Sequence, residues 1–115
     1  MKIGNYEFSR IVIDEKAYTS DVVIYPDHVD SNWWRKEGHK LQIEDLSAAL
    51  EWGPEALIVG TGADGMMKIT KEMQTYLKSK GIKLISAITA DACRKHNELV
   101  EKNGQKVVTA LHLTC

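Results

Sequence analysis

The sequence predicts a single α/β domain, and three observations lead to that fold class. Short apolar runs alternate with segments in which apolar residues recur every three or four positions, which indicates strands alternating with helices. The chain has 115 residues, enough for one hydrophobic core but too few for two well-packed domains. Its composition, 43% hydrophobic and 27% charged, excludes disordered and fibrous classes. Residues 1–115 are therefore expected to form one domain.

The N-terminal part predicts a β-hairpin. Residues 8–13 and 17–25 have the composition of two strands, and the three polar residues between them form a turn of hairpin length. Pro26 ends the second strand, because proline cannot donate a ladder hydrogen bond. Residues 27–42 follow as a connection of irregular composition that is long for a small domain.

After that connection, helices and strands alternate along the chain. Helical spacing is found in three segments. The first runs from Ile43 to a stop at Gly53 and Pro54, and the second runs from a cap at Thr70 to a left-handed turn at Gly81. The third runs from a cap at Thr89 or Asp91 to Lys102, and Asn103 and Gly104 end it. Strands are expected at residues 56–59, 82–88 and 107–113. This order predicts helices packed on a mixed sheet.

A glycine-rich loop follows the predicted strand 56–59. Gly60, Gly62 and Gly65 spell G-x-G-x-x-G, a pattern that binds dinucleotides when it opens a helix at once. Here residues 66–69 intervene before the next helix, and the following strand ends without the carboxylate that would bind a ribose. We therefore expect a tight turn with positive φ and close backbone approach, and no bound cofactor.

A second hypothesis for this loop is an anion site. Exposed N–H groups of residues 61–65 could form a nest, with Lys68 as the counter-charge. Thr89 and Asp91 follow the next strand, and α/β folds place ligands at such strand ends. The candidate ligand-binding residues of this region are Gly60, Thr61, Gly62, Asp64, Gly65, Lys68, Thr89 and Asp91.

A second cluster, Trp33, Trp34, Arg35 and His39, lies in the long connection. Adjacent side chains of an extended segment point to opposite faces, so at least one indole is expected to be half exposed. Tryptophan and arginine dominate binding hot spots, which makes these four residues candidates for a partner surface. The alternative is a loop held in place by indole packing over a sheet face.

No catalytic or metal site is expected. Cys93 and His96 share a helix face, and His112 precedes Cys115 by three positions, but neither pair has the spacing of a zinc site. Paired carboxylates and the G-x-S-x-G pattern are absent from the sequence, and no serine has a recognisable triad pattern. The sequence thus leaves enzymatic activity undecided and favours a protein without it.

Charge and cysteine usage bear on partners and location. Fifteen basic and sixteen acidic residues give a net charge of −1, which provides no general attraction for nucleic acid or anionic lipid. Two cysteines are too few for a disulfide framework, which suits a reducing compartment. No signal-peptide pattern or apolar run of membrane-spanning length is found in the sequence. A cytoplasmic protein is expected.

Four segments together resemble a known family: YTSDVVI at 18–24, NWWRKEGH at 32–39, LIVGTG at 57–62 and ALHLTC at 110–115. This small single-domain family of unassigned biochemical function includes an adipogenesis-associated domain protein and an assembly factor of mitochondrial complex I, and its prokaryotic branch is the most similar. The resemblance implies a three-layer α/β fold with a mixed five-stranded sheet and a last strand antiparallel to its neighbours.

The resemblance also implies an assembly or regulatory role. We therefore expect a non-enzymatic interaction module with a protein partner, present as a monomer or a weak homo-oligomer. The alternative is a small-molecule or anion-binding protein, an enzyme included, that uses residues 60–65. An antiparallel last strand would place His112 in a buried, structural role, whereas a parallel one would bring it to the edge that carries Thr61 and Thr89.

Overall fold

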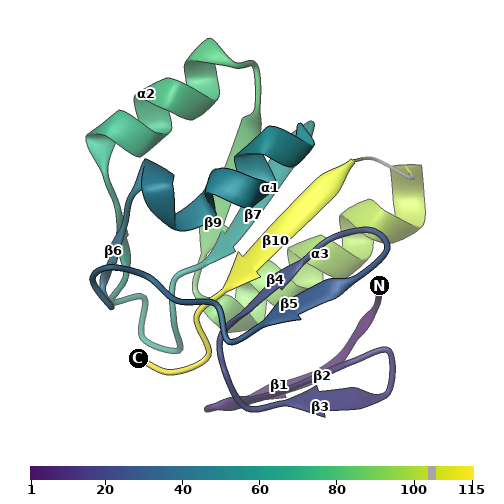
Figure 1. Cartoon of the computed structure of the whole chain (residues 1–115). Coiled ribbons are helices and arrows are strands. Elements are labelled where there is room, and N and C mark those ends of the chain that lie inside the picture. Colours follow the sequence, from purple (N-terminus) through teal and green to yellow (C-terminus); the bar gives the residue numbers. More distant parts are fainter. Residues whose placement is uncertain (104–105) are drawn as a thin grey trace.

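The computed structural model describes residues 1–103 and 106–115 and contains one mixed five-stranded sheet (Figure 1). The strand order is β5-β4-β10-β7-β9. The strands are β4 (Val22–Ile24), β5 (Val29–Ser31), β7 (Ala56–Gly60), β9 (Lys83–Ala87) and β10 (Val107–Leu111). The mixed five-stranded α/β fold predicted from the sequence is confirmed.

The last strand, β10, has one antiparallel and one parallel neighbour. It is antiparallel to β4, with Leu111 opposite Val22, as the resemblance implies. It is parallel to β7, with Leu111 opposite Gly60, so the expectation of an antiparallel arrangement does not hold on this side. The helix before β10 returns the chain across the sheet, as parallel neighbours require. The carboxyl ends of β7, β9 and β10 therefore meet at one edge, which we call the carboxyl edge.

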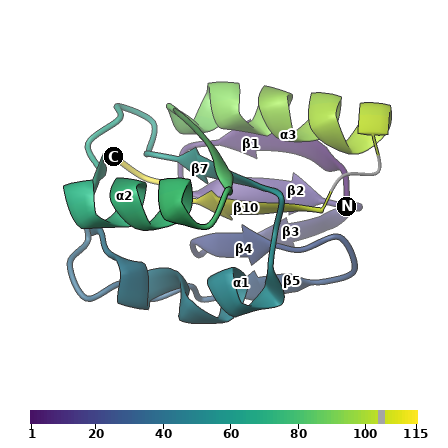
Figure 2. The same cartoon turned by 90° about the horizontal axis from the view of Figure 1, so that it is seen from above.

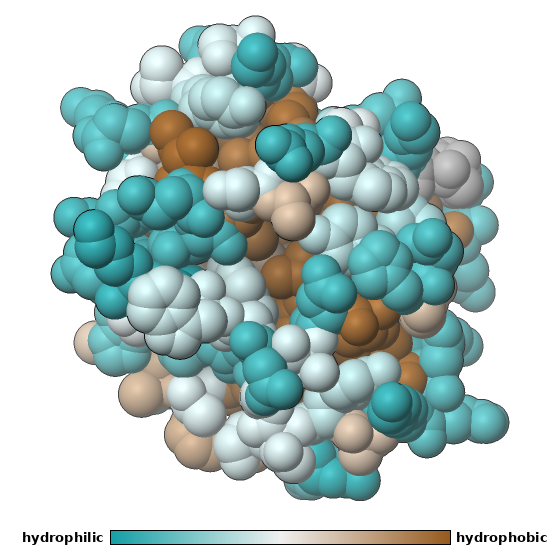
Figure 3. All heavy atoms as spheres, in the orientation of Figure 1, coloured by the Kyte–Doolittle hydropathy of each residue, from teal (hydrophilic) through white to brown (hydrophobic). Residues whose placement is uncertain are grey.

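Helices and a second sheet cover the two faces of the five-stranded sheet (Figure 2). One face carries α1 (Ser47–Trp52), which continues a 3-10 turn at Ile43–Leu46, and α2 (Lys71–Ser79). The other carries α3 (Thr89–Asn103) and the three-stranded sheet of β1 (Ile3–Glu7), β2 (Arg10–Ile13) and β3 (Lys16–Tyr18). The result is a three-layer arrangement. On the face that Figure 3 shows, most of the strongly apolar atoms lie in hollows between hydrophilic residues.

Strand β10 separates two hydrophobic cores because its side chains alternate between the faces. Val107 and Leu111 pack in the core under α3 and the N-terminal sheet. Val108 and Ala110 pack in the core under α1 and α2. All four side chains are buried, and Leu113, beyond the strand, is buried on the α3 side.

The N-terminal region differs from its prediction. The expected strand 8–13 begins only at Arg10, and a preceding strand, β1, was missed because glycine and asparagine interrupt its apolar pattern. The expected single strand 17–25 is two strands in different sheets, β3 and β4, separated by residues 19–21. Asp14 and Glu15 both have positive φ, as in a two-residue hairpin turn of type I′.

Most of the predicted helix signals are confirmed. Thr70 Oγ1 accepts a hydrogen bond from the Met73 N–H at 3.1 Å, and Gly53 and Gly81 have φ of 80° and 70°. The predicted cap at Thr89 or Asp91 is wrong, because α3 already includes both residues, and the Thr89 hydroxyl bonds elsewhere. Gly104, predicted to end α3, lies outside the described residues.

The connection 27–42 is more regular than predicted. It contains β5 and the short strand β6 (Lys40–Leu41), which is parallel to β8 (Lys68–Ile69). The two-stranded β6-β8 sheet joins the tryptophan-bearing connection to the glycine-rich loop.

Candidate functional site

The candidate site is the carboxyl edge, where residues 112–115 lie against the glycine-rich loop (Figure 1). The His112 N–H donates to the Gly60 carbonyl at 3.0 Å. The Ala63 N–H donates to the carbonyl of residue 114 at 2.7 Å, and the Met66 N–H donates to that of residue 115 at 3.2 Å. These contacts follow from the parallel β7-β10 pair, which directs both chains to the same edge.

Leu113 joins the other connections to this edge. Its carbonyl accepts from the Ser9 N–H of the β1–β2 turn at 3.0 Å and from the Tyr6 hydroxyl of β1 at 2.9 Å. Its N–H donates to Asp21 Oδ1 at 2.8 Å. Residues 112–115 thus bond to the β1–β2 turn, the β3–β4 connection and the glycine-rich loop.

Thr89 has a structural role, although the sequence suggested a ligand-binding one. Its hydroxyl donates to the His112 carbonyl at 2.6 Å and accepts from the Gly62 N–H at 2.9 Å. The residue is fully buried, so this hydroxyl has no access to a ligand. Asp91 is half-buried at the first turn of α3 and pairs with Arg94, three residues on.

The tight turn predicted for the glycine-rich loop is confirmed. Gly62 and Gly65 have φ of 108° and 70°, where L-residues are strained. A Cβ on Gly62 would lie 2.6 Å from the Cys115 carbonyl oxygen, and one on Gly60 would lie 2.7 Å from Leu111 Cδ2. The glycines are therefore required for close approach of this loop to residues 111–115.

The prediction that the N–H groups of residues 61–65 are exposed is wrong. Those of Thr61, Gly62, Ala63 and Gly65 all donate to protein acceptors. The acceptors are Ala87 O, Thr89 Oγ1, the carbonyl of residue 114 and Gly62 O. Most of these acceptors are distant in the sequence, which is why the sequence alone did not indicate that the N–H groups of the loop are paired. Four of the five N–H groups are therefore not available to an anion, so the loop does not present the row of free amides that a nest requires.

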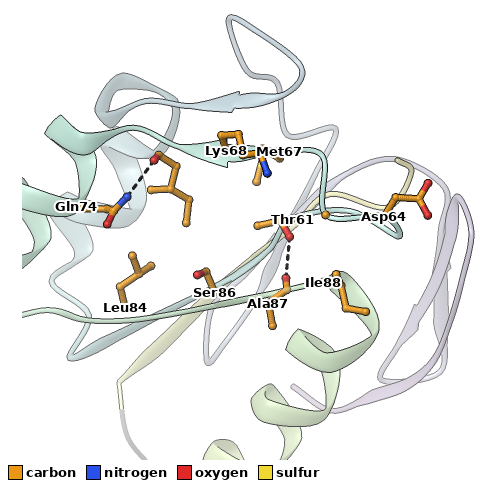
Figure 4. Close-up of a pocket in the computed structure, with 11 residues that line it drawn as sticks. Thr61, Asp64, Met67, Lys68, Gln74, Leu84, Ser86, Ala87 and Ile88 are labelled. Carbon is orange, nitrogen blue, oxygen red and sulfur yellow. Dashed lines mark hydrogen bonds between the residues drawn. The ribbon is translucent and has the colours of Figure 1, made fainter.

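A groove of about 570 Å³ lies beside the loop, between β8 and β9 (Figure 4). Four of the predicted residues line it: Thr61, Asp64, Gly65 and Lys68. Sequence reasoning missed the other lining residues, which come from α2, β9 and their neighbours: Met67, Ile69, Gln74, Leu84, Ser86, Ala87 and Ile88. The lining mixes apolar side chains such as Met67, Ile69 and Leu84 with the polar groups of Thr61, Asp64, Lys68, Gln74 and Ser86, which suits a ligand with both kinds of surface.

A buried polar cluster of Asp21, Arg35 and His112 lies at the same edge. Arg35 Nη1 donates to Asp21 Oδ2 at 2.8 Å, and the Arg35 side chain is 5% exposed. His112 Nδ1 also lies 2.8 Å from Asp21 Oδ2, and a hydrogen on that nitrogen satisfies the contact. Arg35 therefore anchors its loop as part of the core, and Asp21 is a site residue that the sequence did not single out.

The protonation of Asp21 depends on this cluster. Burial raises the pKa of Asp21, but hydrogen bonds from His112, the Leu113 N–H and Arg35 outweigh it, so the pKa lies below its ordinary value of 3.8. His112 is buried as predicted, and its Nδ1–H donates to Asp21; Arg35 Nη2 lies 3.1 Å from the same nitrogen, which has no lone pair left to accept from it. Among the described residues, its Nε2 is the one buried side-chain polar atom without a partner.

The two tryptophans have different environments, as predicted. Trp33 is partly buried, its Nε1 donates to the Asp45 carbonyl at 2.9 Å, and the Arg35 guanidinium lies 4.6 Å from its ring centre. Trp34 is 76% exposed. His39 is exposed, and its ring centre lies 5.8 Å from that of His112.

The exposed large apolar side chains of the described chain are all at this edge. They are Phe8, Trp34, Met66 and Ile88, which we call the apolar rim. Phe8 is in the β1–β2 turn, Trp34 in the β5–β6 connection, Met66 in the glycine-rich loop and Ile88 at the β9–α3 junction. Each of these connections contacts residues 112–115 or a neighbour of that segment. Ser9 bonds to Leu113, Met66 bonds to Cys115, and Arg35 bonds to Asp21, which is the partner of His112. A Cβ on Gly65 would lie 3.3 Å from Ile88 Cγ2.

Other chemistry is limited in the part of the chain that the structure describes. Within residues 1–103 and 106–115, no three His, Cys, Asp or Glu side chains are grouped so that they could hold a metal ion. None of the helices in those ranges is long and apolar enough to cross a membrane. Cys93 is free and buried, and burial raises the pKa of its thiol to about 12, so it stays protonated at neutral pH.

Comparison with known proteins places this fold in a family. The family model described as "Protein of unknown function (DUF498/DUF598)" matches residues 3–112. A conserved hypothetical protein of Pyrococcus horikoshii is similar, with 27% identity, a TM-score of 0.80 and full coverage of both chains.

Two bacterial structures show the same fold at lower identity. A Xanthomonas campestris protein has 21% identity and a TM-score of 0.83, over 96% of this chain and 83% of that one. A Mth938-like domain of Bordetella pertussis has 20% identity and a TM-score of 0.68, over 97% of this chain and 85% of that one.

Replacement of Gly62 by alanine should destabilise the fold. The added Cβ combines a strained φ with a backbone clash against residue 115, so Gly62→Ala should lower the free energy of unfolding by at least about 2 kcal/mol. Gly38→Ala is the matched control, because nothing lies within 4 Å of its Cβ, and it should change stability by less than about 0.5 kcal/mol. Urea unfolding measures both, and equal stabilities would contradict the close approach.

Asp21→Asn should lower the free energy of unfolding by about 3–5 kcal/mol at pH 7, because Arg35 would keep a buried charge without its partner. The pKa of Asp21 is lowered on folding, so its contribution is complete above the unfolded value, near 3.8, and is lost as pH falls through the lower folded value. Urea titrations at pH 7, 5 and 2.5 should show the difference between variant and wild type shrinking only at the lowest pH. An equal difference at all three would refute this ionised pair.

Proposed function

The chain belongs to the DUF498/DUF598 family of proteins of unknown function, and from that premise we propose that it is an interaction module that binds a protein partner through the apolar rim. The observation that supports this proposal is the distribution of Phe8, Trp34, Met66 and Ile88. Four separate connections each place one large apolar side chain at the same edge of the sheet. Exposed apolar groups gathered in this way mark interaction sites more often than scattered single residues do.

Trp34 is the central residue of the proposal. With 76% of its surface exposed, its indole contributes little to the core, whereas the adjacent Trp33 is held by Asp45 and Arg35. A large, rigid side chain that stays exposed can bury much area on binding at a low entropy cost. Its backbone is held in place by Arg35, so little order has to be gained when a partner binds.

A role in assembly or regulation is the finer form of this proposal. It is supported by the resemblance of residues 32–39 and 110–115 to a family whose members have such roles, and these segments carry Trp34 and the residues that position the rim. We also propose a cytoplasmic location, which the two free cysteines suit, and a monomer or weak homo-oligomer in the absence of the partner.

The test begins with recovery of the partner from cells that make this protein naturally, followed by titration of the purified partner. Trp34→Ala should weaken binding about 30-fold or more, which corresponds to the ~2 kcal/mol of a hot-spot residue. Met66→Ala should weaken it several-fold.

Tyr76→Ala is the matched control, since this partly exposed aromatic lies on α2 and outside the rim. The Tyr76→Ala variant should bind the partner with the same affinity as the wild type. A partner that binds Trp34→Ala and Met66→Ala as tightly as the wild type would contradict the proposal, as would a loss confined to Tyr76→Ala.

A further inference from the structure

Strand β9 is the last strand of the five-stranded sheet on one side, and no other strand within residues 1–103 and 106–115 pairs with its outer edge, which we call the free edge. Two hydrogen bonds show which of its peptide groups pair with β7: the Lys83 N–H donates to the Glu55 carbonyl at 3.0 Å, and the Ala87 carbonyl accepts from the Thr61 N–H at 2.9 Å. Alternate residues of a strand direct their peptide groups to opposite sides. The peptide groups of Leu84 and Ser86 therefore point away from β7.

The groove of Figure 4 runs along this free edge. Leu84 and Ser86 form one wall, and Lys68 and Gln74 lie on the opposite side. A strand added beside β9 would pair with the outward peptide groups of Leu84 and Ser86. Because strand side chains alternate between faces, every second side chain of the added strand would enter the groove.

The chain around this groove is rich in lysine, although the charged residues that line the groove itself are Lys68 and Asp64. Residues 68–83 contain five lysines and one acidic residue, Glu72, in a chain whose net charge is −1. The five are Lys68, Lys71, Lys78, Lys80 and Lys83. All five are exposed, and in the described ranges none of them forms an ion pair. This local excess of positive charge attracts an acidic ligand at the edge.

We propose that the free edge of β9 binds an extended, acidic protein segment, which adds as a sixth strand beside β9. Main-chain hydrogen bonds to Leu84 and Ser86 position the segment, apolar side chains enter the groove beside Met67 and Ile69, and the lysines select acidic residues. This site is separate from the rim residue Trp34 and does not require the partner proposed above.

The probe is a fluorescein-labelled nonapeptide of the repeat Glu-Glu-Val, which presents acidic and apolar side chains on both faces of a strand. Fluorescence anisotropy should show saturable binding to the wild type. The peptide N-methylated at every residue, which lacks main-chain donors, should bind at least about tenfold more weakly. A Lys-Lys-Val peptide should bind at least as weakly, and 10 mM inorganic phosphate should not displace the acidic peptide.

Protein variants locate the binding to this edge. Ser86→Pro removes an outward N–H that does not bond to β7, and it should weaken binding of the acidic peptide about tenfold or more. Lys68→Glu combined with Lys83→Glu should do the same, whereas the matched control Lys16→Glu, on β3, should have no effect. Trp34→Ala should also bind the peptide normally, because Trp34 does not line the groove, whereas Ile88 of the rim does.

The proposal is overturned if the acidic peptide does not bind at millimolar concentration, or if the N-methylated peptide binds as tightly as the unmodified one. It is also overturned if phosphate displaces the peptide, which would indicate a small-anion site. Circular dichroism and thermal unfolding check that each variant is folded. If Ser86→Pro does not fold, the modified peptides and the double lysine variant still decide the outcome.

Discussion

In the described part of the chain, seven hydrogen bonds hold the backbone groups of residues 112–115 in place, and the arrangement of the carboxyl edge depends on them. The ladders of the sheet fix β7 and β10, but they leave the loops that follow these strands free. Backbone groups of residues 112–115 bond instead to the β1–β2 turn, Asp21, the glycine-rich loop and Thr89. Leaving a buried backbone N–H or carbonyl group without a partner costs free energy. These connections are therefore held in the positions where they form hydrogen bonds with the backbone of residues 112–115. The apolar rim is the outer surface of the same connections.

The pair of Asp21 and Arg35 extends this constraint to the tryptophan-bearing connection. Both groups lie mostly out of water, with side-chain exposures of 16% and 5%, and neither would be stable there alone. The Arg35 guanidinium also donates to the Gly38 carbonyl at 2.9 Å, which closes the loop on itself. One ion pair therefore joins the β3–β4 connection to residues 33–38 and leaves Trp34 as the exposed residue of that loop.

Local signals in the sequence predicted the elements well and the contacts between them poorly. The Thr70 cap, the left-handed Gly81 and the positive φ of Gly62 depend on nearby residues and were predicted correctly. The break of the strand at residues 19–21 was missed, because the Asp21 carboxylate bonds to Leu113, 92 positions away. The partners of the N–H groups in the glycine-rich loop were missed for the same reason, because most of them are distant in the sequence. Ser86 was missed as a groove residue because only the order of the strands places it beside the loop.

Native-state hydrogen exchange tests most directly whether residues 112–115 hold the edge together. The N–H groups of Ser9, Ala63 and Met66 belong to different connections, yet they donate to the carbonyls of residues 113, 114 and 115 in turn. If the segment holds these connections jointly, the three should open as one unit, with the same opening free energy and the same response to denaturant. Three unrelated opening free energies, or exchange at unprotected rates, would contradict the account.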